Sequence, residues 1–198
     1  MMTGFMRTYI RWVDAVNYRI GRVAMYGIFV LIAILLWSSL SKVLSDDPFH
    51  LLDAPANWTL EMAQFAMVAY YIVGGPYSLQ MGSNVRMDLF YGDWSPKKKA
   101  WYDAFTVICL LTFLGVLLYG GLTSLAYSLG YWGDHPFQFF IGLLTGSEEI
   151  GRLEVSRRAW RPYMWPIKAI MVLGILLMLL QAVSEFFKDI FLIRGEEV

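Results

Sequence analysis

The chain has 198 residues, of which 58% are hydrophobic and 16% charged, and its 16 basic and 16 acidic side chains give a net charge of zero. Soluble domains carry about 25% charged residues, so this composition excludes an ordinary soluble enzyme or nucleic-acid-binding protein. The single cysteine, Cys109, cannot form an internal disulfide or a redox pair. His50 and His135 lie in polar connections, which excludes a facing pair of haem ligands within the apolar runs. No cofactor is expected on this chain.

The first predicted element is a short amphipathic N-terminal helix. Apolar side chains recur at helical spacing at Phe5, Tyr9, Val13, Val16 and Ile20. The charged residues fall elsewhere on the helical wheel, at Arg7, Arg11 and Asp14. This pattern predicts a helix at the cytoplasmic membrane interface. The alternative is a water-exposed extension of the first span.

Four apolar runs approach or exceed the roughly 20 residues that a membrane-crossing helix needs. The predicted spans are approximately 22–44, 58–81, 103–130 and 165–187. The fourth span has the shortest uncharged core. It reaches membrane-crossing length only if Trp165 and Phe187 form its ends and the Lys168 side chain snorkels to the interface. We predict one transmembrane domain over residues 1–198: an all-α, polytopic membrane protein with four transmembrane helices and no independent soluble domain.

The distribution of lysine and arginine predicts the orientation. Basic residues gather in the N-terminal segment and the second connection, at Arg7, Arg11, Arg19, Arg22, Arg86, Lys97, Lys98 and Lys99, whereas the first connection has only Lys42. The positive-inside rule then places both termini in the cytoplasm. The third connection is basic as well, but its arginines alternate with glutamates at spacings that would allow pairing in a helix, Glu148 with Arg152 and Glu154 with Arg158.

Few residues within the spans could carry chemistry. Glu61 is the one ionisable group within the second span, but it lies in the first helical turn, just after Trp58, where the helix dipole favours a carboxylate. We therefore interpret it as a structural or inter-subunit contact and not as an ion site. Gly74, Gly75 and Pro76 indicate a kink or a close helix contact. There is no phosphate-binding loop, metal-ligand cluster or intramembrane chain of acidic residues and histidines.

Three short blocks resemble a known family. Trp58-Thr-Leu-Glu61 opens the second span, and Asn84-Val-Arg-Met-Asp-Leu-Phe-Tyr91 follows it. A third block, which includes Glu154 and Arg161, leads into the last span and ends at Lys168. Together they resemble the small (Q-type) membrane subunit of the tripartite ATP-independent periplasmic (TRAP) transporters over roughly residues 20–187. Asn84 stands where that family's motif has histidine, which leaves Arg86 and Asp88 as the matched polar pair.

The resemblance implies a multi-pass protein of the bacterial inner membrane that is not an enzyme. It would be the small permease subunit of a secondary active, sodium-symport system for the uptake of organic acids or similar solutes. Its partners would be a large permease subunit, where sodium is expected, a periplasmic substrate-binding protein and membrane lipids. Trp58, Glu61, Arg86, Asp88, Glu154 and Arg161 are then expected to make structural, subunit or lipid contacts.

The competing hypothesis is a self-sufficient four-helix membrane protein, such as a homo-oligomeric channel or a membrane-bound enzyme. A channel should carry polar residues along one face of a span. The sequence does not identify the transported solute.

Overall fold

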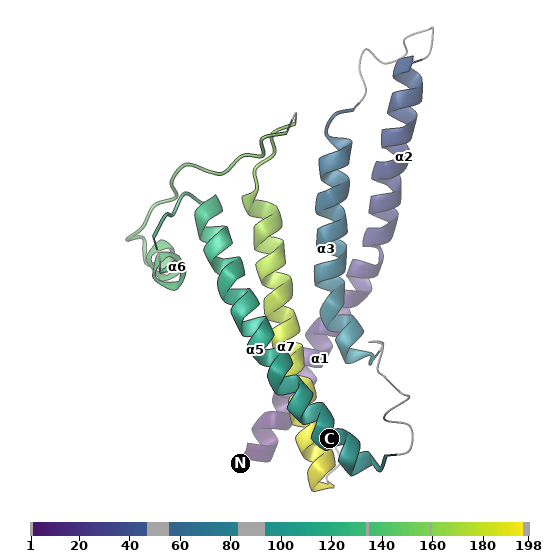
Figure 1. Ribbon diagram of the computed structural model, residues 1–198, viewed down its shortest axis with the longest axis vertical. Coiled ribbons are helices and arrows are strands. Elements are labelled where there is room, and N and C mark those ends of the chain that lie inside the picture. Colours follow the sequence, from purple (N-terminus) through teal and green to yellow (C-terminus); the bar gives the residue numbers. More distant parts are fainter. Residues whose placement is uncertain (1, 47–55, 83–93, 134, 159, 196–198) are drawn as a thin grey trace. The chain divides into compact units, whose positions relative to one another are not determined.

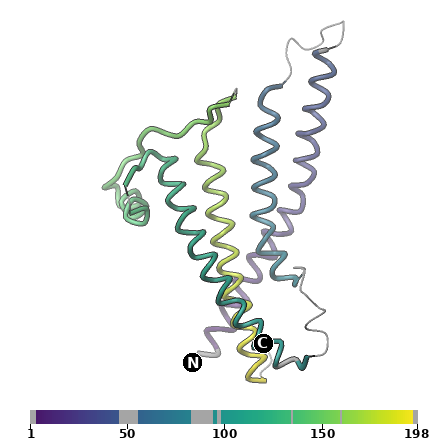
Figure 2. The backbone as a smooth tube through the Cα atoms, viewed as in Figure 1, coloured from purple at the N-terminus to yellow at the C-terminus, as the bar shows by residue number. Residues whose placement is uncertain are grey.

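The computed structural model describes residues 2–46, 56–82, 94–133, 135–158 and 160–195. Its helices are, in chain order, α1 (Met2–Met25), α2 (Gly27–Asp46), α3 (Thr59–Gln80), α5 (Pro96–Ser128), α6 (Pro136–Thr145) and α7 (Trp165–Arg194), as Figure 1 and Figure 2 show. Within these described ranges, the only β pairing is an isolated bridge between Val155 and Tyr163. The predicted all-α fold is confirmed.

Three helical segments of the described chain are long and apolar enough to cross a membrane: Gly4–Ser45, Lys98–Ser128 and Trp165–Arg194. The 22-residue helix α3 is not among them, although it coincides with the predicted span 58–81. It is long enough to cross, but Glu61, Gln64 and Gln80 make it less apolar. The all-α membrane fold is thus supported, whereas membrane crossing by α3 stays a prediction.

The first predicted span, 22–44, contains a break between α1 and α2 at Tyr26. The amide of Tyr26 donates to the carbonyl of Val23, and the amide of Phe29 donates to that of Tyr26, both at 3.1 Å. These bonds span three residues and not four, which is the tighter pattern of a 3₁₀ turn. The N-terminal helix therefore extends through 24 residues before α2 begins.

The chain folds as two compact units, and α1, α3, α5 and α7 each contribute to both. Unit 1 consists of Met1–Arg22, Val73–Gly120 and Leu173–Val198, and unit 2 of Val23–Ile72 and Gly121–Val172. Each unit is described below by itself.

In unit 1, α1 packs against the end of α7 with part of the predicted stripe: Val13 is 2% exposed, and the Tyr9 hydroxyl donates to the Leu180 carbonyl at 3.1 Å. Met6 and Ile10 are buried in a cluster with Phe191, whereas Phe5, which the sequence pattern placed on the apolar face, is 70% exposed. The buried face continues through polar Asn17, which is 2% exposed. The buried face therefore shares Val13 with the predicted stripe, but at the start of the helix it is shifted from Phe5 to Met6.

A second apolar cluster of unit 1 joins α5 to α7. Leu114 of α5 packs with Ile175 and Ala182 of α7, and Leu79 of α3 packs against them. All three central residues are less than 9% exposed, so this contact gives unit 1 its apolar core.

In unit 2, the facing ends of α2 and α3 are joined by hydroxyl groups. The Thr59 hydroxyl donates to the Ser38 hydroxyl at 3.0 Å, and the Ala56 amide donates to the Ser41 hydroxyl at 3.4 Å. Both Ser41 and Thr59 are buried, so these bonds satisfy polar groups that would otherwise be unpaired at the end of the helix pair.

The helix α6 was not predicted. Its signals were present, because Pro136 opens it and Gly146, with φ of 75°, closes it in the left-handed conformation. At 10 residues it is too short to cross a bilayer. It is seen end-on in Figure 1, across the direction of the first turns of α7.

The packing of α1 on α3 in unit 1 predicts a strict requirement for glycine at position 21. A Cβ atom at Gly21 would overlap the side chain of Tyr77, whereas a Cβ at Gly4 would meet nothing within 4 Å. Gly21→Ala should therefore lower the free energy of unfolding by about 1–3 kcal/mol, as overpacked sites do. Thermal unfolding in detergent measures this effect, with Gly4→Ala as the matched control. Equal stability of the two variants would contradict the packing of α1 on α3.

Candidate functional site

The connection between α6 and α7 contains two of the predicted contact residues, Glu154 and Arg161, and forms a short hairpin. Two backbone hydrogen bonds form the Val155–Tyr163 bridge that closes it: the Ser156 amide donates to the Pro162 carbonyl at 2.9 Å, and the Met164 amide donates to the Glu154 carbonyl at 3.1 Å. The hairpin gives this connection a defined shape without a helix.

The predicted helical pairing of the charges in this connection is wrong. Residues 148–158 are not helical, so the four-residue spacing of Glu148 and Arg152 does not bring them together. Glu154 pairs with Lys168 and not with Arg158, whose guanidinium donates instead to the Gln64 side chain at 3.1 Å. The connection lacks the helical backbone that the pairing required.

Lys168 holds the hairpin against the helices of unit 2. Its ammonium group lies 2.5 Å from the Glu154 carboxylate, donates to the Ser124 carbonyl at 3.2 Å and lies 5.6 Å from the centre of the Tyr127 ring. The Glu154 amide also donates to the Ser128 carbonyl at 3.0 Å. The Lys168 side chain, predicted to snorkel to the interface, therefore ends on a carboxylate of the protein.

Arg161 forms the corner of the hairpin. It is exposed and adopts a φ of 49°, in the left-handed region that non-glycine residues seldom occupy. Its amide donates to the Arg158 carbonyl at 3.2 Å, which closes the turn. This arrangement leaves the Arg161 side chain on the surface, where it is available for the predicted contact.

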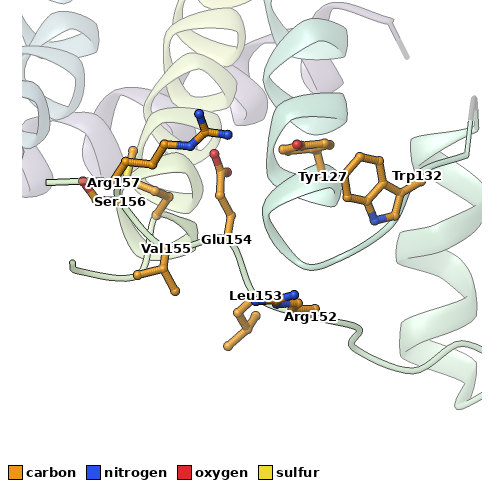
Figure 3. A pocket seen from close by; sticks show the side chains of 9 residues that line it. Tyr127, Trp132, Arg152, Leu153, Glu154, Val155, Ser156 and Arg157 are labelled. Carbon is orange, nitrogen blue, oxygen red and sulfur yellow. The ribbon is translucent and has the colours of Figure 1, made fainter.

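Beside this hairpin lies an open cavity of about 650 Å³, drawn in Figure 3. The rings of Tyr127 and Trp132 meet edge to face on one side, with centroids 4.7 Å apart. In Figure 3, Glu154 and Arg157 extend to one side of the loop, while Arg152 lies on the other. The lining thus combines aromatic surface with groups of both charge signs.

The structure confirms that Glu61 lies in the first turn of α3 and adds that its side chain is buried. Trp58, immediately before the helix, is 36% exposed, whereas Glu61 is only 5% exposed. One Glu61 carboxylate oxygen, Oε2, has no hydrogen-bond partner among the described residues. The sequence pattern indicated the helix start, but not this burial. Arg86 and Asp88 lie outside the described residues, so their predicted contacts stay predictions.

Sequence reasoning missed a polar network in unit 1 that joins α1 to α7. Asp14 Oδ1 accepts hydrogen bonds from Gln181 at 3.0 Å and Ser184 at 3.1 Å, and its Oδ2 lies 2.8 Å from the Lys188 ammonium. Lys188 also pairs with Glu185 at 2.8 Å. The Asp14 carboxylate therefore has donors on both oxygens, and this arrangement suits a structural contact better than a proton acceptor.

The network continues along α1 through Asn17, whose amide donates to Gln181 Oε1 at 2.7 Å. Gln181 is fully buried and also donates to Glu185 at 2.9 Å, while Gln80 of α3 donates to the Asp14 carbonyl at 3.2 Å. A sequence signal existed, because positions 181, 184, 185 and 188 share one helical face. These polar residues follow the apolar core of the last span. A helix that simply ends in water would show the same polar pattern, so the sequence alone does not distinguish the two.

The Lys168 contacts predict how the hairpin responds when they are removed. Lys168→Met keeps the length of the side chain but loses the ion pair and the bond to the Ser124 carbonyl. A hydrogen bond to a charged group contributes about 1.5–3 kcal/mol to stability, so the contact of the hairpin with the helices should weaken. Limited trypsin digestion in detergent should then cut faster after Arg157. Glu149→Gln, which changes an exposed carboxylate of the same connection, is the control. Unchanged cleavage in Lys168→Met would contradict the role given to this lysine.

The comparison with protein families gives a match over residues 50–192 to the model described as tripartite ATP-independent periplasmic transporters, DctQ component. The matched range includes α3, α5, α6 and all but the last two residues of α7, and with them both the hairpin and the α7 half of the polar network. Comparisons with curated proteins and with solved structures returned no match. Because the matched range covers more than half of the sequence, this chain belongs to the DctQ component family of the tripartite ATP-independent periplasmic transporters.

Proposed function

We propose that this chain is the small permease subunit that scaffolds the large transport subunit of a sodium-driven, binding-protein-dependent transporter for organic acids or similar solutes. Membership of the DctQ component family supports a transporter subunit of the inner membrane. The observation that carries the scaffold role is the polar network in unit 1, in which Asp14 is held by three side chains of α7.

A scaffold must keep its shape while a partner moves. The bonds of Asp14 and Asn17 to Gln181 are directional, and Gln181 has no exposed surface. Sliding α1 along α7 would break several of these bonds at once and leave buried polar groups unpaired, at about 1–3 kcal/mol for each group. The network therefore favours one fixed register of the two helices, as a static subunit needs.

The apolar surface of unit 2 supports a role in contact with lipid or another membrane subunit. On α2, Phe29 is 65% exposed, Leu36 58% and Leu40 53%. Side chains of this kind are unfavourable in water but match hydrocarbon or the apolar face of another membrane protein. The large permease subunit and the surrounding lipids would together cover this surface, and the periplasmic binding protein would deliver the solute.

We further propose that both termini lie in the cytoplasm. The basic residues Arg19 and Arg22 precede α2, and Lys98 and Lys99 open α5. Between Arg22 and Arg86 the sequence has a single basic residue, Lys42, near the end of α2. This asymmetry follows the positive-inside rule.

Reconstitution of transport tests the scaffold role. Proteoliposomes with both membrane subunits, the binding protein and an inward sodium gradient should accumulate solute, and the two membrane subunits should co-purify as a stable one-to-one complex. Proteoliposomes with this chain alone should show no uptake above protein-free vesicles, because the Asp14 carboxylate and the Gln181 amide bond to other side chains of the network. Uptake through this chain alone at the rate of the full system would establish the channel alternative.

The same assay separates a structural from a coupling role of Glu61. Glu61→Gln keeps the size of the side chain and removes its charge, so uptake should keep its dependence on sodium concentration when complex yield is matched. Loss of sodium dependence in a complex that assembles normally would show that Glu61 takes part in coupling.

Cysteine labelling tests the orientation. In a Cys109→Ser background, single cysteines near Asp53 and Gly146 should react with a membrane-impermeant thiol reagent in intact spheroplasts, and one at Lys98 should react only after lysis. Strong labelling at Lys98 in intact spheroplasts would reverse the proposed topology.

A further inference from the structure

The short helix α6 of unit 2 has an exposed apolar face. Phe137, Ile141 and Leu144 recur at spacings of four and three residues, which places them on one side of the helix. Their side chains are 53%, 61% and 88% exposed. The described part of unit 2 therefore leaves this face open, and neither the hairpin nor the polar network gives it a role.

A second face of α6 holds the helix against unit 2. Phe139 is 2% exposed, and its ring stacks on that of Tyr131 with the centroids 4.6 Å apart. Gly142, three residues later, is also buried, and a Cβ atom there would overlap the side chain of Glu148. These contacts fix the rotation of α6 about its own axis, and with it the direction of the apolar face.

The third face of α6 is polar and exposed. Gln138 and Thr145 lie seven residues apart, about two helical turns, and so share one side. They directly follow Phe137 and Leu144 in sequence, so the polar face borders the apolar face. The helix contains no charged residue. Its exposed surface thus changes from apolar to polar around the helix, as suits a helix at the boundary between hydrocarbon and water.

The position of α6 within unit 2 agrees with such a boundary. The Lys168 ammonium donates to the Ser124 carbonyl at 3.2 Å, so the first turn of α7 lies beside the last turns of α5. The two membrane-crossing segments that contain these turns end at Ser128 and begin at Trp165. Helix α6 starts soon after Ser128, at Pro136, and runs across the direction of the first turns of α7 (Figure 1). A helix that crosses spanning helices at their ends lies along the membrane surface.

Exposed tryptophans mark the same level. Trp132, between α5 and α6, is 78% exposed, and Trp165, the first residue of α7, is 41% exposed. Tryptophan is enriched where hydrocarbon meets the lipid headgroups, because its ring is apolar and its N–H group is polar. These side chains indicate that the headgroup region lies beside α6.

We propose that α6 is an in-plane membrane anchor whose partner is the lipid surface. Phe137, Ile141 and Leu144 insert among the headgroups and the upper acyl chains, while Gln138 and Thr145 remain in water. A bilayer surface places hydrocarbon and water side by side, which matches the adjoining apolar and polar faces of the helix. Because α6 carries no charge, insertion removes no ionic group from water. This contact does not depend on the scaffold role.

Spin-label accessibility tests the anchor in the assembled transporter in liposomes. In a Cys109→Ser background, the label is attached to Leu144→Cys and, in a separate variant, to Gln138→Cys as the matched control. Oxygen concentrates in lipid and a neutral nickel complex in water, so power saturation with each reagent reports the surroundings of the label. The label at position 144 should be more accessible to oxygen than to the nickel complex, and the label at position 138 should show the reverse order.

Two results would overturn the proposal. A label at position 144 that is more accessible to the nickel complex than to oxygen would place the apolar face in water. Low accessibility to both reagents would show that the large permease subunit covers α6. If Leu144→Cys assembles poorly, Ile141→Cys, at another exposed position of the same face, decides in the same way.

Depth-dependent quenching distinguishes an in-plane helix from a deeply inserted one. A bimane fluorophore on Leu144→Cys should be quenched more strongly by lipids with a nitroxide near the start of the acyl chain than by lipids with a nitroxide near its end. The reason is that an in-plane helix enters the bilayer by only about 5–10 Å. Stronger quenching by the deeper nitroxide would contradict an in-plane anchor.

Discussion

The Asp14 carboxylate lies on the face of α1 that packs against α7, and side chains of α7 supply the hydrogen-bond donors that it needs. The Asp14 side chain is only 23% exposed, and a carboxylate that loses hydration is destabilising unless donors replace the lost water. Gln181, Ser184 and Lys188 supply those donors from one face of α7. The apolar contacts of Met6 and Ile10 with Phe191 bring the helices together. The hydrogen bonds then select one register, because a shift by one turn, about 5.4 Å, would separate all of these pairs.

The same principle organises unit 2, where the charge to be satisfied is that of Lys168 at the start of α7. Glu154, the Ser124 carbonyl and the Tyr127 ring surround its ammonium group, which fixes the hairpin at the helix end. In both units, charged groups thus stabilise contacts within the chain. This use of charge agrees with the proposed scaffold role.

The sequence predicts the long helices well, because the length and apolarity of a segment decide whether it forms a helix in a lipid environment. The predicted span 58–81 corresponds to the helix Thr59–Gln80, and the span 165–187 corresponds to the helix Trp165–Arg194. Contacts were harder to predict. The buried face of α1 and the pairing of Glu154 with Lys168 depend on which elements meet in space. Helical spacing could not identify the Glu154 pair, since the backbone between residues 148 and 158 is not helical. The polar face of α7 is visible in the sequence. Only its contacts with Asp14 and Asn17 of α1 show that it forms a network and is not an ordinary helix end.

The central claim is that the contact between α1 and α7 stays fixed while the transporter works. Spin labels at Ala15 of α1 and Leu176 of α7, both exposed positions of unit 1, would report this contact in a Cys109→Ser background. Distances would be measured by double electron–electron resonance in the assembled transporter in nanodiscs, with and without sodium, solute and binding protein. The account predicts one narrow distance distribution that is the same in every condition. A second population that appears only when sodium, solute and binding protein are all present would contradict a static scaffold.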